Sequence, residues 1–395
     1  MTLDMTGKTI VILSSSTGGG HDMRAVALAE WVERLHGDSV SVTRWQILEE
    51  SSRLDRFGVG LYNWIQRHAP WAHHLYFNFL ELAGLHRRAG QIHGADRFRA
   101  RLKALNPDII VSTHDHLNHG YFELAKQCLG PSLRCLTYCG ELSGGYGFSR
   151  HWVNPEADGF IAAVDACASA AASLGMAPGK TKVGGFLLRP QFFTAEAERA
   201  TRLKTRQALL GEDDGRPLLL LGTGANGANN HAAIIEALRE IKTPLRIVAL
   251  CGRNAVTFRQ LEILNEEMEQ HRIIPLAYRD DMAAILRAVD LAFVRPGTGT
   301  TSECIVCGCP IVFNGIGGVM PQERITLKYL STKGIAVPLV RRPAKLAAIV
   351  EQWLSAEAQD NGGKQREAFA NINRGLSPAG IVQEVLQSSC GIRRG

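Results

Sequence analysis

The sequence lacks several features that would place it in a simple class. None of its 395 residues belongs to an uncharged apolar run of about 18 residues, so a transmembrane helix is not expected. Nine cysteines occur without paired, regular spacing, which favours reduced thiols over a disulfide framework. The first residues place an acidic side chain before their apolar run, unlike a signal peptide, and we therefore expect a cytoplasmic protein.

The chain does have an ordinary globular composition and considerable length. Hydrophobic residues make up 45% and charged residues 21%, which excludes a disordered, collagenous or coiled-coil chain. A single core stops growing at about 250–300 residues, so a chain of 395 residues predicts two domains. The formal net charge of +6 suits an anionic substrate, an anionic membrane or a nucleic acid about equally.

Short β-branched apolar runs recur along the chain, and most are followed by a glycine-rich turn and a longer helical pattern. Such alternation is typical of βαβ units in a parallel sheet that is buried on both faces. We expect strands at residues 9–14, 40–44, 109–113, 135–138, 159–163, 181–184, 218–221, 246–251, 291–294, 310–313 and 336–339.

This pattern predicts an α/β fold of two doubly wound, Rossmann-like domains that face a central cleft. The charged, alanine-rich segment after Pro190 marks the expected boundary. We place a first domain at residues 1–195, a second at 196–376 and a C-terminal helix at 377–395. Ligands of open parallel sheets bind at the carboxyl ends of the strands, so the motifs that follow strands decide the function.

The first motif runs from Ser14 to His21, directly after the first expected strand and before a helical pattern. Its glycines Gly18, Gly19 and Gly20 leave backbone N–H groups bare at a helix N-terminus, where an anion or a closely approaching ligand is favoured. His21 stands at the mouth of the turn, where an imidazole could take a proton from an acceptor hydroxyl. A helix-capping role for His21 explains its position equally well.

The second motif runs from Arg295 to Glu303, again between a strand and a helix. Its glycines and hydroxyls suit a diphosphate, because free amides and the helix dipole face the negative charge. Glu303, one turn into the helix, is placed to accept hydrogen bonds from two vicinal hydroxyls such as those of a ribose. The alternative is capping-box chemistry, but simple capping does not require two glycines interleaved with four hydroxyls.

Other strand ends carry weaker signals. A third glycine-rich loop, residues 222–227, repeats the order of strand, loop and helix. The guanidinium of Arg253 follows another strand, at a sheet edge where it could pair with a phosphate. Cys304, Cys307 and Cys309 span a helix and the next strand without a matching His or Cys pair nearby, so we expect buried thiols rather than metal ligands.

Residues 51–103 differ in composition from the rest of the chain. Their nine basic and three acidic side chains give this stretch a formal charge equal to that of the whole chain, and eight aromatic residues lie among them. Cationic, aromatic and aliphatic residues interleaved on helices are typical of a surface that enters a lipid leaflet and binds anionic headgroups. We expect an anionic membrane partner. The alternatives are an amphipathic insertion packed on its own domain and, with no recognition motif to support it, nucleic acid.

Five segments, at residues 17–21, 184–193, 251–254, 281–282 and 297–303, occur in an order that resembles a known family. They are similar to the monogalactosyldiacylglycerol synthase and processive diacylglycerol glucosyltransferase group, relatives of the lipid-linked peptidoglycan N-acetylglucosaminyltransferase. The resemblance implies the GT-B fold and an inverting transfer from a UDP-sugar that needs no metal.

The resemblance also implies roles for residues of the second half. Glu303 would bind the ribose, and Tyr278 with Met282 would frame the uracil. Helix N-termini with Arg253 or Arg295 could supply positive charge to the diphosphate. The other donor-binding residues are expected in the diphosphate loops and in a loop that contacts the hexose, namely Gly224, Ala225, Asn226, Gly297, Thr298, Gly299, Thr300, Thr301, Gln322 and Glu323.

In the first half, the acceptor crevice is expected to include Gly18, Gly19, Gly20 and His114. The predicted base is His21, or Glu141 if His21 only orients the acceptor. Glu141 lies where the sequence departs from the family, because the Thr-Asp dipeptide expected near Thr137 is replaced by other residues.

The sequence therefore predicts an inverting transferase that moves a hexose from a UDP-sugar to a diacylglycerol-type hydroxyl at the cytoplasmic face of the membrane. The expected partners are the UDP-sugar, the lipid acceptor and the anionic membrane surface, with no metal and no cofactor beyond the donor substrate. The alternatives are a transferase for a soluble acceptor, a UDP-sugar epimerase of the same fold and a non-catalytic nucleotide-sugar sensor.

Overall fold

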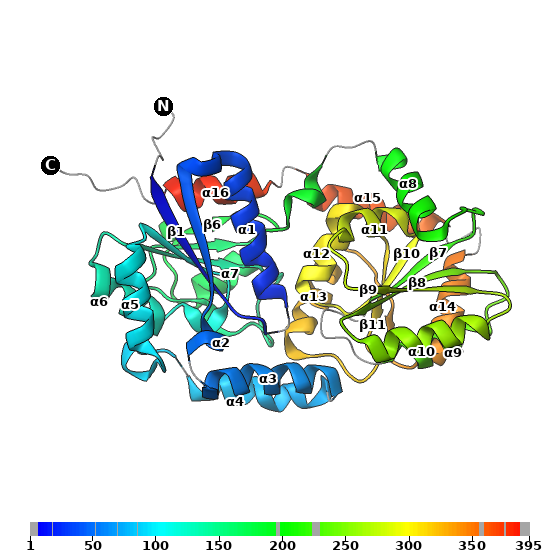
Figure 1. The fold of residues 1–395 in the computed structure, drawn as a ribbon, viewed down its shortest axis with the longest axis horizontal. Helices are drawn as coiled ribbons and strands as arrows, with labels where there is room; N and C mark the ends of the chain where they lie inside the picture. The colour runs from blue at the N-terminus through cyan, green and yellow to red at the C-terminus, as the bar shows by residue number, and fades with distance from the viewer. Residues whose placement is uncertain are drawn as a thin grey trace. The chain divides into compact units, whose positions relative to one another are not determined.

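The computed structural model describes residues 7–17, 19–51, 53–68, 70–84, 86–194, 198–222, 230–354, 359–374 and 377–387. Contacts divide these residues into two compact units. The first unit takes the described parts of 1–64, 72–190 and 376–395, and the second those of 65–71 and 191–375. Each unit contains one six-stranded parallel sheet (Figure 1).

The sheet of the first unit has the strand order β2-β1-β3-β4-β5-β6. Its strands are β1 (Lys8–Ser14), β2 (Val40–Gln46), β3 (Ile109–Ser112), β4 (Arg134–Cys139), β5 (Gly159–Ala162) and β6 (Thr181–Val183). The helices in this part of the chain are α1 (Gly20–His36), α2 (Ile47–Ser51), α3 (Arg53–His68), α4 (His73–Ala83), α5 (Ala95–Leu105), α6 (Gly120–Leu129), α7 (Asp165–Ser173) and the last helix, α16 (Pro378–Gln387).

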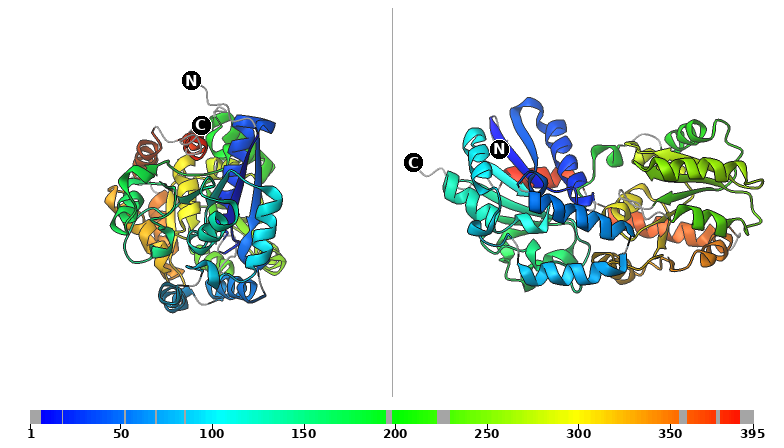
Figure 2. Two further views of the ribbon diagram at one scale, coloured as in Figure 1. Left: turned by 90° about the vertical axis from the view of Figure 1, so that its left-hand side faces the viewer. Right: turned by 60° about the horizontal axis from the view of Figure 1, so that its bottom comes forward.

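Strand β1 is an inner strand of this sheet, and its side chains show that the sheet is covered on both faces. Ile10, Val11, Ile12 and Leu13 are all fully buried, so side chains on both faces of the strand are covered. A continuous apolar run of this kind is typical of strands with helices on both sides, and helices flank the sheets in this way (Figure 2).

The C-terminal helix, which the sequence placed in a segment of its own, groups with the first unit. Gly184, which follows β6, lies so close to α16 that a Cβ there would come within 2.8 Å of Ile381. The glycine therefore permits the close approach of the helix to the end of the strand.

The sheet of the second unit has the strand order β12-β11-β10-β7-β8-β9. Its strands are β7 (Leu218–Gly222), β8 (Arg246–Gly252), β9 (Arg272–Ala277), β10 (Leu291–Val294), β11 (Ile311–Asn314) and β12 (Leu339–Val340). Its helices are α8 (Glu198–Leu210), α9 (His231–Leu238), α10 (Ala255–Glu266), α11 (Met282–Ala288), α12 (Thr298–Cys307), α13 (Pro321–Thr332), α14 (Ala344–Leu354) and α15 (Gln359–Asn373).

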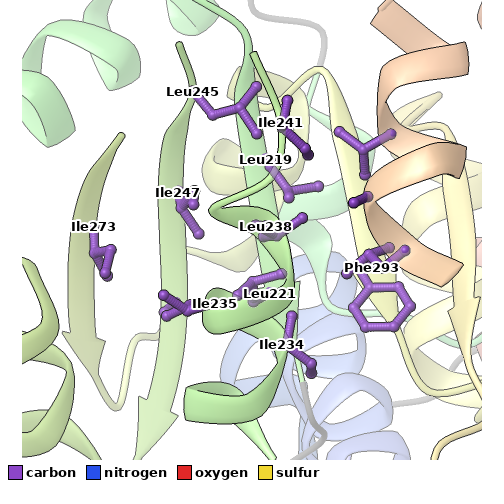
Figure 3. Close-up of a cluster of buried hydrophobic side chains, with 14 of the residues drawn as sticks. Leu219, Leu221, Ile234, Ile235, Leu238, Ile241, Leu245, Ile247, Ile273 and Phe293 are labelled. Atoms are coloured by element: carbon purple, nitrogen blue, oxygen red, sulfur yellow. The ribbon is translucent and has the colours of Figure 1, made fainter. Parts of the chain in front are cut away.

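The core of the second unit forms between its sheet and the helices that cover it. Leu219, Ile247 and Phe293 of neighbouring strands belong to one buried cluster with Ile235 and Leu238 of α9 (Figure 3). These apolar side chains are almost completely removed from water, and burial of each contributes about 1.5–3 kcal/mol.

Two strands of the second unit differ from the sequence-based prediction, and a proline lies inside one of them and directly before the other. β9 was not predicted because Pro275 interrupts its apolar run. The strand forms nevertheless because it lies at the edge of the sheet, where a missing N–H is tolerated. β12 begins at Leu339, after Pro338, whose carbonyl accepts a hydrogen bond from the Phe313 N–H at 2.8 Å.

The strand orders reverse at one place in each sheet. In the first unit the chain switches direction between β1 and β3, and in the second between β7 and β10. Crevices for ligands open at such switch points, outside the carboxyl ends of the strands. The residues that follow β1, β3, β7 and β10 are therefore the first candidates for a functional site.

Candidate active site

The turn after β1 carries the histidine that the sequence predicts as the base. Gly19 has a φ of 79°, and α1 begins at the next residue, Gly20. A side chain at Gly19 would strain this left-handed conformation, so the turn requires glycine there. Space is open beside Gly20, since among the described residues no atom outside its chain neighbours and its own helix backbone lies within 4 Å of the position that its Cβ would take. Gly18 lies outside the described residues.

The segment after β3 holds both ends of this turn. Nδ1 of His21 lies 2.9 Å from the carbonyl oxygen of Thr113, and the Thr113 hydroxyl donates to the carbonyl of His21 at 3.0 Å. Oγ1 of Thr17 lies 2.8 Å from Nε2 of His114. Because a carbonyl oxygen only accepts, Nδ1 of His21 carries the proton and Nε2 is the acceptor. His21 thus has the tautomer that a general base needs.

The surroundings of His21 keep it neutral. Burial disfavours its charged form, and the imidazole of His114, whose ring centre lies 4.3 Å away, acts in the same direction. Together they lower the pKa of His21 to about 3, although the carboxylate of Asp115 opposes the shift. At ordinary pH the ring can accept a proton, and its strength as a base depends on compensating negative charge nearby.

Glu141, the other predicted base, follows β4 and is buried. Burial raises its pKa to about 7, while the positive charge of Arg24 opposes the shift. Arg24 also donates to the carbonyl of Gly140 at 3.0 Å, which fixes the backbone beside the carboxyl group. Within the described part of the chain, no hydrogen-bond partner reaches Oε2 of Glu141. A carboxyl group with this pKa exchanges protons readily at neutral pH.

Other polar side chains around His21 and His114 were not predicted from the sequence. Oδ1 of Asp115 lies 3.0 Å from Nδ1 of His114, and the rings of His116 and His151 are 4.9 Å apart. Asp115 follows the predicted His114 at the end of a strand beside the switch point. That position could have drawn attention to it, because side chains after the two strands converge there.

Glu49 of α2 was also missed, and it anchors the start of the turn. Its Oε1 accepts from the Ser15 hydroxyl at 2.9 Å, from the Ser16 N–H at 2.5 Å and from the Ser16 hydroxyl at 2.7 Å. More than 30 residues separate Glu49 from these serines, so no local pattern signals the contact.

His21, His114 and Asp115 lie close enough together to raise the question of a cation site. Each offers one ligand atom, and these atoms lie within 4.8 Å of one another. Both ring nitrogens of His114 already have partners, Thr17 on one side and Asp115 on the other. To bind a cation, His114 would have to exchange one of these contacts.

In the second unit, the predicted diphosphate motif forms the start of α12. Gly297 is the N-cap residue, and Thr298, Gly299, Thr300 and Thr301 make up the first turn. The first amides of a helix have no partner inside it, so this end favours an anion. Glu303 is half-buried further along the same helix.

Arg295 and Glu323 form a buried ion pair, a contact that the sequence did not predict. The Arg295 guanidinium donates to both carboxylate oxygens, at 2.9 and 2.6 Å, and also to the carbonyls of Ile316 and Gly318. The same carboxylate accepts from the Met320 N–H at 2.8 Å. These contacts differ from the expected roles at the diphosphate and the hexose, because the opposite charges neutralise each other and fix the loop between β11 and α13.

The other predicted donor residues occupy the rim of the same sheet. The guanidinium of Arg253 lies 5.3 Å from the ring centre of Tyr278, which is more than half exposed. Met282 is the first residue of α11, and Gln322 lies in the first turn of α13. Gly224, Ala225 and Asn226 fall outside the described residues.

Three cysteines of α12 and the following turn were expected to be buried thiols and not metal ligands. Cys304 and Cys309 are buried thiols, and Cys307 is partly buried. A hydrogen bond with the Cys309 thiol, together with burial, holds the pKa of Cys304 well above its ordinary value, so it stays protonated and unreactive.

Two parallel sheets with turns at their switch points are typical of a class of two-domain α/β proteins. Comparison with known proteins identifies this class. Residues 219–314 match the glycosyltransferase family 28 C-terminal domain. The structure of MurG from Acinetobacter baumannii superposes with a TM-score of 0.57 at 17% identity, over 96% of this chain and 98% of that one. UGT89C1 from Arabidopsis thaliana, complexed with UDP-L-rhamnose, gives a TM-score of 0.62 at 14% identity, over 97% and 99%. The chain has the GT-B fold and is a glycosyltransferase.

Relatives with similar sequences indicate which glycosyltransferases this chain resembles. The chloroplast monogalactosyldiacylglycerol synthase of Spinacia oleracea is 25% identical over 373 residues, which cover 89% of this chain and 67% of the relative. The processive diacylglycerol beta-glucosyltransferase of Bacillus licheniformis is 23% identical over 402 residues, covering 97% and 96%. The resemblance inferred from five short segments is thereby confirmed over most of the chain.

Proposed function

We propose that this glycosyltransferase moves a hexose from a UDP-sugar to the hydroxyl of a diacylglycerol-type lipid, with inversion at the anomeric carbon. The relatives that carry diacylglycerol in their names support the lipid acceptor. Structural neighbours of the same fold that are complexed with UDP and glucose, or with UDP-glucose, support the donor. The single observation in this molecule that carries the lipid acceptor is an exposed apolar surface on α3 and α4.

This surface, which we call the α3–α4 face, consists of two stripes with helical spacing. Phe57, Leu61 and Trp64 lie at positions i, i+4 and i+7 of α3, and Leu75, Phe79 and Leu82 repeat the spacing on α4. All six are exposed. Leu75 and Leu82 have 71% and 83% of their surface open to solvent. Apolar side chains so arranged on a helix are typical of an interfacial surface that enters the headgroup region.

The two helices hold each other in place from their inner sides. The ring centres of Tyr62 and His73 are 4.5 Å apart, and the Tyr76 hydroxyl contacts the carbonyl of Gly58. Exposed Arg56, Arg87 and Arg88 belong to the same basic segment. Cations beside exposed apolar residues favour an anionic leaflet, where each contributes about 1 kcal/mol near the surface. We therefore place the enzyme at an anionic membrane face, the cytoplasmic one.

Among the described residues, no helix is both long and apolar enough to cross a bilayer. Attachment through the α3–α4 face would instead be peripheral. It would bring the site after β1 and β3 to a lipid whose hydroxyl lies at the membrane interface.

The chemistry proposed for the transfer is a single displacement. The acceptor oxygen forms a bond to C1 of the hexose, the bond between C1 and the UDP oxygen breaks, and the acceptor proton passes to Nε2 of His21. The imidazolium that forms is costly in this buried site, and the carboxylate of Asp115 partly compensates its charge. UDP leaves with the bonding electron pair.

In the second unit, the proposed donor site uses the first turn of α12 for the diphosphate and Glu303 for the ribose. Arg253 is the better source of positive charge for the leaving group, because Arg295 is already neutralised by Glu323. Helix N-terminal amides and a cation stabilise the charge that develops on UDP as the bond breaks. Tyr278 and Met282 remain the proposed frame for the uracil.

The experiment that tests the function is a panel of UDP-sugars incubated with the enzyme and a membrane-lipid extract. The expected result is UDP release that depends on the extract and a new glycolipid in equal amount. Release with soluble alcohols but not with lipids would overturn the lipid acceptor. Conversion of the UDP-sugar alone into an isomer would identify an epimerase.

The membrane contact is tested separately by sedimentation with vesicles of phosphatidylglycerol or of phosphatidylcholine alone. Replacing Leu75, Phe79 and Leu82 by serine should abolish binding to the anionic vesicles. The matched control replaces Leu203, Val256 and Ile263, exposed apolar residues of the second unit, and should bind normally. Equal loss in both triple variants would contradict a specific role of the α3–α4 face.

A further inference from the structure

We propose that Asp115, His114 and Thr17 form a positioning relay that holds the glycine turn, and with it His21, in its catalytic position. The inference rests on the proposed function, because it assigns these side chains to the proton transfer of that reaction. The three residues come from the ends of β1 and β3, the two strands that flank the switch point of the first sheet.

The carboxylate of Asp115 determines which groups of the relay donate and which accept hydrogen bonds. Its Oδ1 lies 3.0 Å from Nδ1 of His114 and accepts from the backbone N–H of His116 at 3.1 Å. Although burial opposes its ionisation, the imidazoles of His116 and His114 hold the pKa of Asp115 well below its usual range. Asp115 is therefore an acceptor at any ordinary pH.

An ionised carboxylate decides which nitrogen of His114 carries the proton. If Nδ1 had only its lone pair, two acceptors would face each other at 3.0 Å and repel. The backbone N–H of His116 lies 3.1 Å from both Nδ1 of His114 and Oδ1 of Asp115, so it keeps the carboxylate as its acceptor when Nδ1 carries a proton. In that tautomer Nδ1 donates to Asp115 and Nε2 has the lone pair. We assign this tautomer from the hydrogen-bond network.

Nε2 of His114 then accepts from the hydroxyl of Thr17, at 2.8 Å. The chain of carboxylate, imidazole and hydroxyl is polarised in one direction, and such chains strengthen each of their hydrogen bonds. Thr17 and His114 are both nearly buried, with 9% and 3% of their surfaces exposed, so water competes little for these contacts.

The consequence concerns the turn between Thr17 and His21. The relay holds its first residue, while the carbonyl and hydroxyl of Thr113 hold its last. Between them lies Gly19 in the left-handed region, where glycine has a large conformational freedom to lose. The segment 113–115 therefore holds the described residues at both ends of this turn. Asp115 and His114 act through Thr17 and are positioning residues.

The kinetic test removes the hydroxyl of Thr17 without changing its shape. Thr17→Val should lower kcat about 10- to 100-fold, the usual consequence of misplacing a catalytic group by about 1 Å, with the KM for the UDP-sugar nearly unchanged. Thr17→Ser keeps the hydroxyl and should restore most of the activity. Thr43→Val, on the edge strand β2, is the matched control and should behave like the unchanged enzyme.

Asp115→Asn provides a second variant if Thr17→Val folds poorly. It keeps the shape of the side chain and removes the charge, and it should also lower kcat while leaving the donor KM unchanged. Full activity of Thr17→Val, or a serine variant as weak as the valine variant, would overturn the relay.

A measurement independent of turnover separates this inference from the proposed function. Nitrogen NMR of the histidine rings in the full chain should report the Nδ1–H tautomer for His114, whatever reaction the enzyme catalyses. The Nε2–H tautomer would overturn the relay. A stoichiometric divalent metal in the purified protein that is lost in His114→Gln would replace the relay with a metal site.

Discussion

The turns after β1 and after β10 have the same local architecture and different chemistry. Each follows a buried parallel strand at a switch point and leads into a helix whose first turn is rich in glycine or hydroxyls. In the first unit the turn is surrounded by imidazoles and carboxylates within hydrogen-bond distance. In the second unit the partly buried N-terminus of α12 follows Arg295, whose charge is paired with that of Glu323.

Under the proposed function, this difference assigns proton transfer to the turn after β1 and binding of the charged leaving group to the turn after β10. In the proposed reaction the first turn receives the proton, because Nδ1 of its histidine faces a carbonyl and Nε2 is the proposed acceptor. In the proposed reaction the second turn binds a stationary negative charge, because helix N-terminal amides and the helix dipole need no protonation step. The comparison predicts that changes in the first unit affect turnover and changes in the second affect binding or stability.

The largest effect is expected for His21→Ala. Loss of a general base costs about 10²- to 10⁴-fold in rate, so kcat should fall by about that factor while UDP affinity is unchanged. Steady-state kinetics and calorimetry of UDP binding measure the two quantities. His36→Ala, at the other end of α1, is the matched control. Near-normal turnover of His21→Ala would show that His21 is not the base. It would also contradict the proposed difference between the two turns.

The next largest effect is on stability, in the second unit. Glu323→Gln leaves the buried guanidinium of Arg295 without its counter-charge, and breaking such a pair costs about 3–5 kcal/mol. Thermal unfolding should therefore begin at a lower temperature. The double variant Arg295→Met with Glu323→Leu removes both charges and should recover much of the loss. An unchanged melting curve for Glu323→Gln would show that the pair contributes nothing.

Glu303→Ala should weaken binding of the UDP-sugar about 10- to 100-fold, because hydrogen bonds to a charged group contribute about 1.5–3 kcal/mol. The value of kcat at saturating donor should change little. Glu262→Ala, an exposed carboxylate on α10, serves as the control. If kcat falls and the donor KM does not, Glu303 acts on the transition state and the division of work between the units is wrong.

The smallest effect distinguishes the two predicted bases through pH. A base must be deprotonated to work, so activity rises with pH through its pKa. With a pKa of about 3 for His21, kcat/KM should be nearly flat around neutral pH. A rise through pH 7 that disappears in Glu141→Gln would instead match the pKa of about 7 for Glu141 and transfer the role to that carboxyl group.

Sequence reasoning located the turns because the local signal is strong. The run 10–13 is uniformly apolar, and the glycines after it cannot continue a strand, so the position of His21 at a helix start could be predicted. The same logic located the Thr298 turn after β10. It missed β9, because Pro275 is acceptable only where the strand has no neighbour on one side, which depends on the strand order.

The partners of the site residues could not be predicted in the same way. Glu49 contacts Ser16 across more than 30 positions and Arg295 contacts Glu323 across 28, so no periodicity links them. Arg295 illustrates the consequence. Beside a glycine-rich turn it looked like a phosphate ligand, but the fold brings a buried carboxylate to it.

By itself the sequence determined the βαβ alternation, the glycine turns and the family, because these depend on hydrophobic patterning and on residues adjacent in the chain. Only the tertiary structure decided the contacts of His114, the neutral state of His21 and the neutralisation of Arg295. These properties arise from burial and from charges that come together through the parallel strand order. Electrostatic interactions depend on distance in space and on exclusion of water, and neither can be read from spacing along the chain.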